Sequence, residues 1–255
     1  DWFRDDFLGI VREMRWSYLP PLMVYFAAGV SGFTGIIESF FVKEQLGLSA
    51  AFLAGLGFWA GLPWALKMPV GHLVDLFWRW KAGFVYLGAA LMAASLLIMV
   101  GLTGHTHQMT AILPADTWYV VAVMLSPVGY VLQDVVADAM TVEAVPTRED
   151  DGTPIPTEDL QQMHVTMQTL GRVAIIGGSA MVAGTGGWLA TTLSYATMYR
   201  IALVIPLISV TGVVLAAWLR PPAAPGGASR GAPAPSRPKV EVNPHILWGS
   251  AAFVA

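Results

Sequence analysis

Residues 118–142, WYVVAVMLSPVGYVLQDVVADAMTV, decide how this chain folds. The stretch can cross a bilayer as one helix, since a span needs roughly 20 predominantly apolar residues. It nevertheless carries two carboxylates, Asp134 and Asp138, and two other apolar stretches each carry one cation, Lys67 and Arg172. A charge at bilayer depth is costly and is kept where it faces a cavity or another charge. The sequence therefore predicts a membrane protein with a polar interior.

The composition supports this class. Hydrophobic residues make up 55% of the chain and charged residues 12%, about half the share of roughly 25% that is typical of soluble domains. There is no cysteine, which excludes disulfides and thiolate metal sites. The net charge of −3 is small, so we expect no nucleic-acid partner. We also expect no cofactor.

Six apolar stretches of bilayer length lie between residues 18 and 219. We expect them to form an all-α bundle of six transmembrane helices. The connections between them are short, except for a polar, acidic, proline-containing loop at residues 143–162. The six predicted spans are 18–41, 50–74, 82–102, 118–142, 163–189 and 198–219.

Three further segments flank the predicted bundle. Residues 1–17 are charged and amphipathic and predict a cytoplasmic N-terminal segment rather than a signal peptide. Residues 220–243 contain the run PPAAPGGASRGAPAPSRP, which predicts a flexible cytoplasmic linker because it cannot bury a core. Residues 244–255 end in a short apolar run, and we interpret them as the start of a seventh transmembrane helix that continues beyond this chain.

The distribution of Lys and Arg predicts the orientation in the membrane. A cytoplasmic N-terminus leaves ten of these cations inside and only Lys43 and Arg200 outside, which the positive-inside rule favours. We expect the protein in the inner or plasma membrane. His105 and His107 then face outward, and they lack a third ligand nearby, so a solvated loop is favoured over a metal site.

The layout of six spans, a cytoplasmic linker and further apolar sequence resembles the N-terminal half of the major facilitator superfamily, in which two six-helix halves are joined by a cytoplasmic loop. The segment 71–81, GHLVDLFWRWK, is similar to the loop motif of that superfamily. The resemblance implies a cytoplasmic lock formed by Asp75, Arg79 and Lys81. Asp138 is a further candidate for this lock, against Arg79 or Lys81. The alternative is that Arg79 and Lys81 are only positive-inside anchors.

A narrower resemblance rests on four segments taken together. The segment 41–49 (FVKEQLGLS) precedes Pro-Trp-x-x-Lys at 63–67, and 134–143 (DVVADAMTVE) precedes 167–172 (MQTLGR). In this order they resemble the folate–biopterin transporter family. The chain departs from the pattern we expected in one place, because Met68 separates the lysine from Pro69. The resemblance implies a carrier of a folate- or pterin-like organic anion.

The charged residues are also predicted to meet by position alone. At 1.5 Å per residue, Asp134 lies roughly 12 Å and Arg172 roughly 14 Å from the cytoplasmic ends of their spans, and Lys67 lies at a similar depth. Our hypothesis is that Asp134 pairs with Lys67 or Arg172 in one state and is released by substrate or a proton in another. Lys67 and Arg172 suit an anionic ligand, Arg in a bidentate manner. The alternative is a static polar lock between helices.

Four other polar residues in or near the spans have less specific roles. Gln133 and Gln168 are candidates for hydrogen bonding a pterin ring, with ordinary interhelical hydrogen bonds as the alternative. Glu38 and Glu143 lie close to span ends, where we expect interfacial roles rather than ligand binding.

Two functions follow from the sequence. The first is a secondary transporter of a folate- or pterin-like anion that works by alternating access, with Asp134 or Asp138 as candidates for carrying a coupled proton. The second is a non-transporting scaffold or assembly subunit of a larger complex, for example a photosynthetic one. The expected partners are a small organic anion, the lipid bilayer, and a second transporter half or a larger membrane complex. We expect no enzymatic activity, because the sequence contains no nucleophile elbow, metal cluster or phosphate-binding loop.

Overall fold

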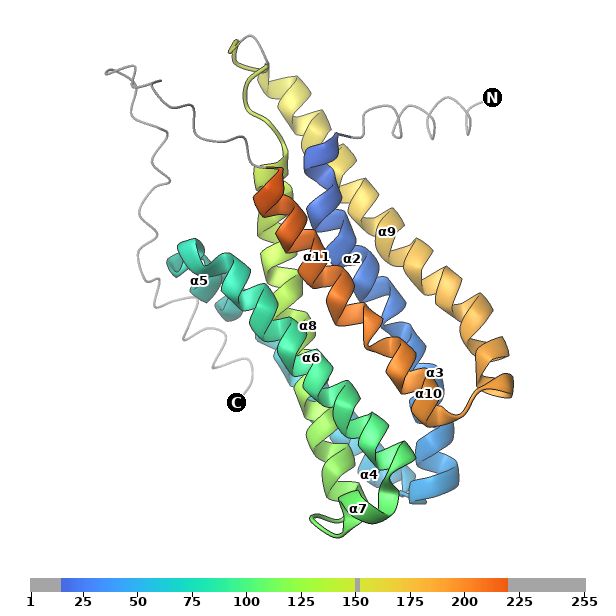
Figure 1. The fold of residues 1–255 in the computed structure, drawn as a ribbon. Coiled ribbons are helices and arrows are strands. Elements are labelled where there is room, and N and C mark those ends of the chain that lie inside the picture. The colour runs from blue at the N-terminus through green and yellow to red at the C-terminus, as the bar shows by residue number, and fades with distance from the viewer. Residues whose placement is uncertain (1–14, 150–151, 220–255) are drawn as a thin grey trace.

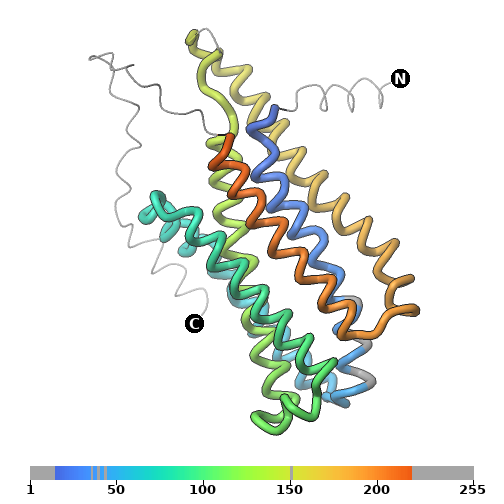
Figure 2. Tube along the Cα trace, in the orientation of Figure 1, coloured from blue at the N-terminus to red at the C-terminus, as the bar shows by residue number. Residues whose placement is uncertain are grey.

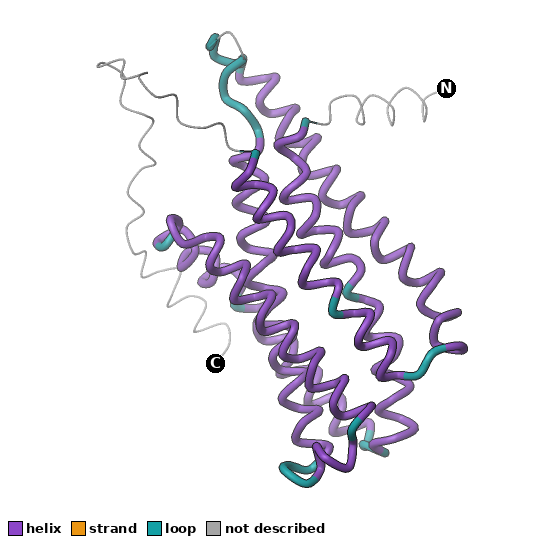
Figure 3. The backbone as a smooth tube through the Cα atoms, viewed as in Figure 1, coloured by secondary structure: helices purple, strands orange, loops and turns teal. Residues whose placement is uncertain are grey.

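The computed structural model describes residues 15–149 and 152–219. Within these ranges the regular elements are helices, apart from one isolated bridge between Arg148 and Pro154. Helices run the length of the molecule, and the loops are short except for the one between Ala144 and Thr157 (Figure 3). Most of the predicted amphipathic segment 1–17, the linker 220–243 and the predicted start of a seventh helix at 244–255 lie outside the described residues.

Four segments of the described chain are long and apolar enough to cross a membrane. They correspond to the third to sixth predicted spans. The fifth begins earlier than predicted, because Thr157 to Gln162 are already helical and acidic residues are favourable in a first helical turn. The segments are Trp78–Gly104 (η3, Trp78–Trp80, with α6, Lys81–Gly104), Ala115–Ala144 (α8), Thr157–Thr192 (α9) and Tyr195–Trp218 (α10, Tyr195–Ala202, with α11, Val204–Trp218).

The first predicted span is not one uninterrupted helix. After the short η1 (Trp16–Tyr18), α2 (Leu19–Val30) ends at Ser31 and α3 (Gly32–Phe41) begins directly after it. The chain then widens into a π-helical turn, η2 (Val42–Leu46), which ends at Gly47 in the left-handed region at φ 58°. The region is helical as predicted but is divided into shorter pieces.

The second predicted span is divided at Leu66. α4 (Ala50–Ala65) ends there and α5 (Lys67–Leu76) begins, with Lys67 as its first residue. Pro69 accounts for the break, because its ring would clash with the carbonyl of Ala65 four residues earlier in a continuous helix. The described residues therefore contain four long apolar segments and, before them, two helical regions that are interrupted.

The helices pack as a bundle whose first and last described helices lie side by side. α2 packs against both α11 and α9, while α6 packs along α8 (Figure 1). The chain path in Figure 2 brings the start of α2 and the end of α11 together. We call this the Lys81 end, since α6 also begins near it. We call the opposite end, where α6 leads into α7 (Thr106–Thr110), the Thr106 end.

Two helix crossings depend on glycine. A Cβ atom on Gly29 of α2 would lie 2.2 Å from the carbonyl oxygen of Ile175 on α9. Between α6 and α8, a Cβ on Gly88 would lie 2.6 Å from the oxygen of Gly129, and the reverse holds equally. Small residues let the backbones approach this closely, and the α2–α9 crossing brings both helices to the cavity described next.

Candidate functional site

A cavity of about 830 Å³ lies between α2, the α4–α5 break, α8 and α9. Its volume falls in the range of roughly 300–1,000 Å³ that is typical of small-molecule sites. All five residues predicted to bind substrate or form the charge network line it, as does Asp138. These six are Lys67, Gln133, Asp134, Asp138, Gln168 and Arg172.

Lys67 bridges two carboxylates inside this cavity. Its Nζ lies 2.5 Å from Oδ2 of Asp134 and 2.8 Å from Oδ2 of Asp138. The two aspartates are one turn apart on α8, which places them on one helix face. Lys67 and Arg172 were the two partners predicted for Asp134, and in the structure Asp134 forms its ion pair with Lys67.

The break in the second span positions this lysine. Because Lys67 follows Leu66 directly, its side chain leaves the chain where α4 ends and α5 changes direction. On the other side of the network, the hydroxyl of Tyr25 on α2 donates to Oδ1 of Asp138 at 2.5 Å. Both oxygens of Asp138 thus have donors. This arrangement differs from the predicted lock of Asp138 against Arg79 or Lys81.

Arg172 and Gln168 reach the cavity from α9, one turn apart. Both are exposed. Arg172 makes no ion pair with any residue that the structure describes. A guanidinium that faces a cavity without a carboxylate partner can bind a ligand carboxylate through two parallel hydrogen bonds.

Gln133 is held by the bundle instead. Its side chain is buried, and Nε2 donates to the carbonyl oxygen of Val85 on α6 at 3.3 Å. This is the interhelical hydrogen bond named above as the alternative to ligand binding. Of the two glutamines, Gln168 is therefore the better placed to meet a ligand.

Three aromatic residues also line the cavity, and the sequence analysis predicted a ligand-binding role for none of them. Tyr25 comes from α2, Trp64 from the last turn of α4, and Tyr130 from α8. Trp64 is partly exposed. Aromatic faces of this kind stack on planar rings. Trp64 was part of the quoted Pro-Trp-x-x-Lys motif. The sequence of an apolar span does not indicate which of its aromatic residues face a cavity and which face lipid.

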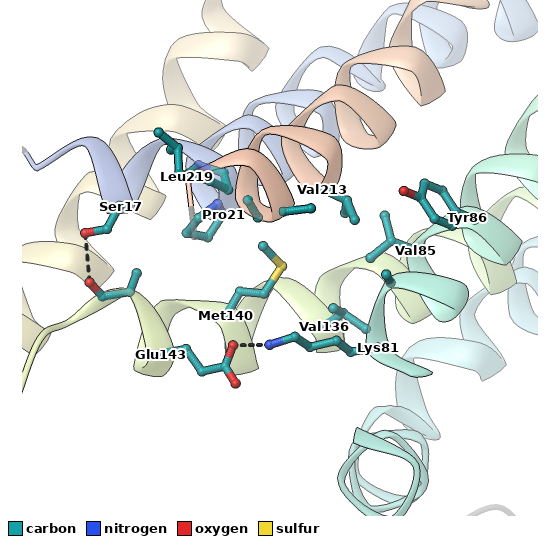
Figure 4. Close-up of a pocket in the computed structure, with 15 residues that line it drawn as sticks. Ser17, Pro21, Lys81, Val85, Tyr86, Val136, Met140, Glu143, Val213 and Leu219 are labelled. Atoms are coloured by element: carbon teal, nitrogen blue, oxygen red, sulfur yellow. Dashed lines mark hydrogen bonds and ion pairs between the residues drawn. The ribbon is translucent and has the colours of Figure 1, made fainter. Parts of the chain in front are cut away.

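A second, smaller cavity of about 340 Å³ lies at the Lys81 end, between α2, α6, α8 and α11 (Figure 4). At its edge Lys81 forms an ion pair with Glu143, and Ser17 donates a hydrogen bond to the carbonyl of Ala144 at 2.9 Å. Glu143 also accepts from Nε1 of Trp78 at 2.8 Å. The other residues that line this smaller cavity are mainly apolar.

The remaining members of the predicted cytoplasmic lock do not join this pair. Asp75 and Arg79 are exposed around the connection from α5 to α6, and neither forms an ion pair with a described residue. His105 and His107 are also exposed, and no cluster of three metal-binding side chains occurs in the described part of the chain.

The described residues form a helical bundle, and four of its segments have the length and apolar composition of membrane-spanning helices, which is typical of an integral membrane protein. A polar cavity between such helices is a feature of transporters. The chain is similar to the folate-biopterin transporter of Synechocystis sp., with 26% identity over 203 residues. The match covers 78% of this chain and 37% of the relative, so the chain spans well under half of that protein's length. No family model matches the chain, and no solved structure matches it. The likeness supports the transporter resemblance, while membership of the major facilitator superfamily stays a prediction.

Proposed function

We propose that this chain forms the ligand-binding half of a secondary transporter for a folate- or pterin-like organic anion. The observation that carries the proposal is the cavity in which Arg172 makes no ion pair with a described residue, opposite Lys67 and its two carboxylates. In a static polar lock we would expect each cation to be paired with a carboxylate. Here one cation is bridged and the other faces open space.

The cavity suits the two chemical parts of such a ligand. Tyr25, Trp64 and Tyr130 offer faces for a planar heteroaromatic ring, and Gln168 offers an amide that can both donate and accept hydrogen bonds. Arg172 would hold a carboxylate in a bidentate pair. A molecule with a flat polar ring at one end and a carboxylate at the other fits this arrangement.

The mechanism follows from competition for Lys67. A ligand anion that enters the cavity attracts Lys67 and weakens its bonds to Asp134 and Asp138. Because Lys67 begins α5 just after the break at Leu66, such a change acts at the point where α5 can turn relative to α4. Alternating access needs a second half around a central site, and we propose that further sequence or a partner supplies it.

The exposed faces of the bundle are compatible with a second half and with lipid. Only 17% of the most apolar window of α9 is buried, against 44% for the segment that contains α6. α9 also contributes Arg172 and Gln168 to the cavity. We propose that the cavity side of α9 faces the second half. The predicted orientation, with the N-terminus in the cytoplasm, belongs to the same proposal.

The test is uptake of labelled folate and pterins by proteoliposomes that contain the full-length protein. We expect saturable uptake in the parent protein and its loss in Arg172→Ala and Asp134→Asn. Arg148→Ala is the matched control, because Arg148 lies in the loop before α9 and bonds only the carbonyl of Gly152 among the hydrogen bonds described. Absence of uptake from folded protein for every pterin tried would reject this substrate class and favour the scaffold alternative.

A further inference from the structure

A third acidic group lies inside the bundle, away from the Lys67 network. Glu38 on α3 is partly buried, and its Oε1 accepts a hydrogen bond from the hydroxyl of Tyr119 on α8 at 2.6 Å. Within the described residues no cation forms an ion pair with Glu38. Two aspartates share one lysine in the cavity, whereas this carboxyl has only a neutral donor.

The surroundings of Glu38 are apolar. The adjacent Ile37 is fully buried, and it belongs to one core cluster with Phe41, Tyr119 and Tyr199. The hydroxyl of Tyr199 on α10 is buried and has no hydrogen-bond partner in the structure. Tyr199 belongs to the same core cluster as Tyr119, whose hydroxyl is bonded to Glu38. The Tyr199 hydroxyl is therefore a second potential donor in the cluster around the Glu38 carboxyl, and it makes no hydrogen bond in the present conformation.

The elements packed around Glu38 contribute few charges. α8 carries Asp116 at its exposed start, and α10 carries Tyr195, which packs edge-on against Phe41, and the exposed Arg200. Arg200 lines a separate cavity at the Thr106 end. The part of α9 that follows Arg172 has no titratable residue. α2 contributes Tyr25, which is bonded to Asp138, and the side chains at 43 and 44 in η2 are not described.

Glu38 lies beyond the cavity, in the helix that follows the break at Ser31. Tyr25, Ala28 and Ser31 line the cavity, and Glu38 follows Ser31 by seven residues, roughly 10 Å at the helical rise. On α8, Tyr119 precedes the cavity residue Tyr130 by eleven residues, or three turns. The Glu38–Tyr119 contact therefore lies outside the cavity, between the cavity and the Thr106 end.

We propose that Glu38 is the carboxyl through which the carrier takes up and releases a coupled proton, an assignment that rests on the proposed transport function. In the present conformation Glu38 is the neutral acid, because a carboxylate among apolar side chains without a cation is costly. When α3 and α8 separate at the Thr106 end, water enters and accepts the proton from the O–H bond of Glu38. Tyr119 and Tyr199 then donate to the carboxylate that remains. Asp134 and Asp138 are less suited to this role, since both carboxylates contact the ammonium group of Lys67, which favours their ionised forms.

The first test needs no substrate. Infrared difference spectra of the full-length protein in lipid, recorded between neutral and alkaline buffer, should show the carbonyl stretch of a protonated carboxylic acid. This band should vanish in Glu38→Gln, shift in frequency in Tyr119→Phe, which removes the donor, and persist in Asp116→Asn, the matched change of an exposed acid on α8. A Glu38→Gln spectrum that keeps the whole band would overturn the proposal.

The second test uses transport. With a pH gradient imposed across proteoliposomes, accumulation of labelled ligand should fall in Glu38→Gln to the level of liposomes without protein, while exchange between internal and external ligand persists, since exchange moves no net proton. Gradient-driven accumulation that survives in Glu38→Gln would overturn the proposal, and so would loss of exchange. If the parent protein transports nothing, the transport proposal fails by itself, and the infrared result still decides whether Glu38 holds a proton.

Discussion

Two lysines in the described part of the bundle contact carboxylates, and their surroundings differ. Lys67 bridges Asp134 and Asp138 in the large cavity, where the aspartate side chains are 13% and 48% exposed. Lys81 pairs with one carboxylate, Glu143, at the Lys81 end, and its Nζ also lies 4.1 Å from the ring centroid of Trp78. The first network has more negative than positive charge, and the second is balanced.

The difference separates a network that can exchange partners from one that holds helices together. In the cavity, a ligand or proton can change the charge balance, because one cation serves two carboxylates and Arg172 lies nearby. At the Lys81 end, every group is satisfied by a neighbour: Glu143 has Lys81 and Trp78, and Lys81 has Glu143 and the indole face. The same residue types thus serve binding in one region and packing in the other.

Removal of Lys67 should have the largest effect. Lys67→Gln leaves Asp134 and Asp138 without a cation and one turn apart, where like charges repel. Only Asp134 of the three is mostly buried, at 13% exposed. The expected loss in the free energy of unfolding is therefore about 2 kcal/mol, between the values for exposed and buried ion pairs, and we expect loss of uptake. Chemical denaturation in detergent micelles checks the stability.

Two comparisons sharpen the interpretation of Lys67→Gln. The variant Lys81→Gln should lose only about 1 kcal/mol, because it leaves a single carboxylate without its cation and Glu143 keeps the Trp78 donor. Addition of Asp134→Asn to Lys67→Gln should restore much of the stability, since it removes one of the two uncompensated charges. Equal losses for Lys67→Gln and Lys81→Gln would contradict the distinction between the two networks.

The long helices were predictable from the sequence, and the breaks were not. Hydropathy over a window of bilayer length indicated the segments that became α6, α8, α9 and α11, with ends shifted by a few residues. The same measure cannot detect a change of direction inside an apolar stretch, so the breaks at Ser31 and Leu66 were missed. Pro69 was a local signal for the second break, since proline is incompatible with a continuous helix there.

The charged part of the cavity was predictable for a physical reason that its aromatic part lacks. Because charge in a bilayer is costly, Lys67, Asp134 and Arg172 stood out, and all three line one cavity. Tyr25 and Tyr130 are ordinary residues of apolar spans, so their orientation could not be inferred. Glu38 was expected at an interface because it lies near a span end, whereas its contact with Tyr119 depends on how α3 and α8 cross.

A smaller effect should follow from removing the hydroxyl of Tyr25. Tyr25→Phe deletes the donor to Oδ1 of Asp138 but leaves Lys67 in place. Hydrogen bonds to charged groups contribute about 1.5 kcal/mol or more, so we expect a loss of about that size in stability and a roughly tenfold change in ligand affinity. Tyr86→Phe is the control, because Tyr86 is partly exposed on α6 and lines the smaller cavity. A Tyr25→Phe protein that matches Tyr86→Phe in both measurements would show that the hydroxyl does not support the network.

The smallest effect should come from Glu143→Gln. The amide oxygen can still accept from Nε1 of Trp78, and Lys81 keeps its position over the indole ring, so only the charge attraction is lost. An ion pair near the end of a bundle contributes about 0–1 kcal/mol, and salt screens it, since the screening length falls from about 10 Å at 0.1 M to about 3 Å at 1 M. The difference in melting temperature between parent and Glu143→Gln should therefore be small at low salt and vanish at high salt, with uptake unchanged. A large difference that persists at high salt would mean that the Lys81–Glu143 pair is as tightly built into the bundle as the Lys67 network, and the contrast between the two regions would not hold.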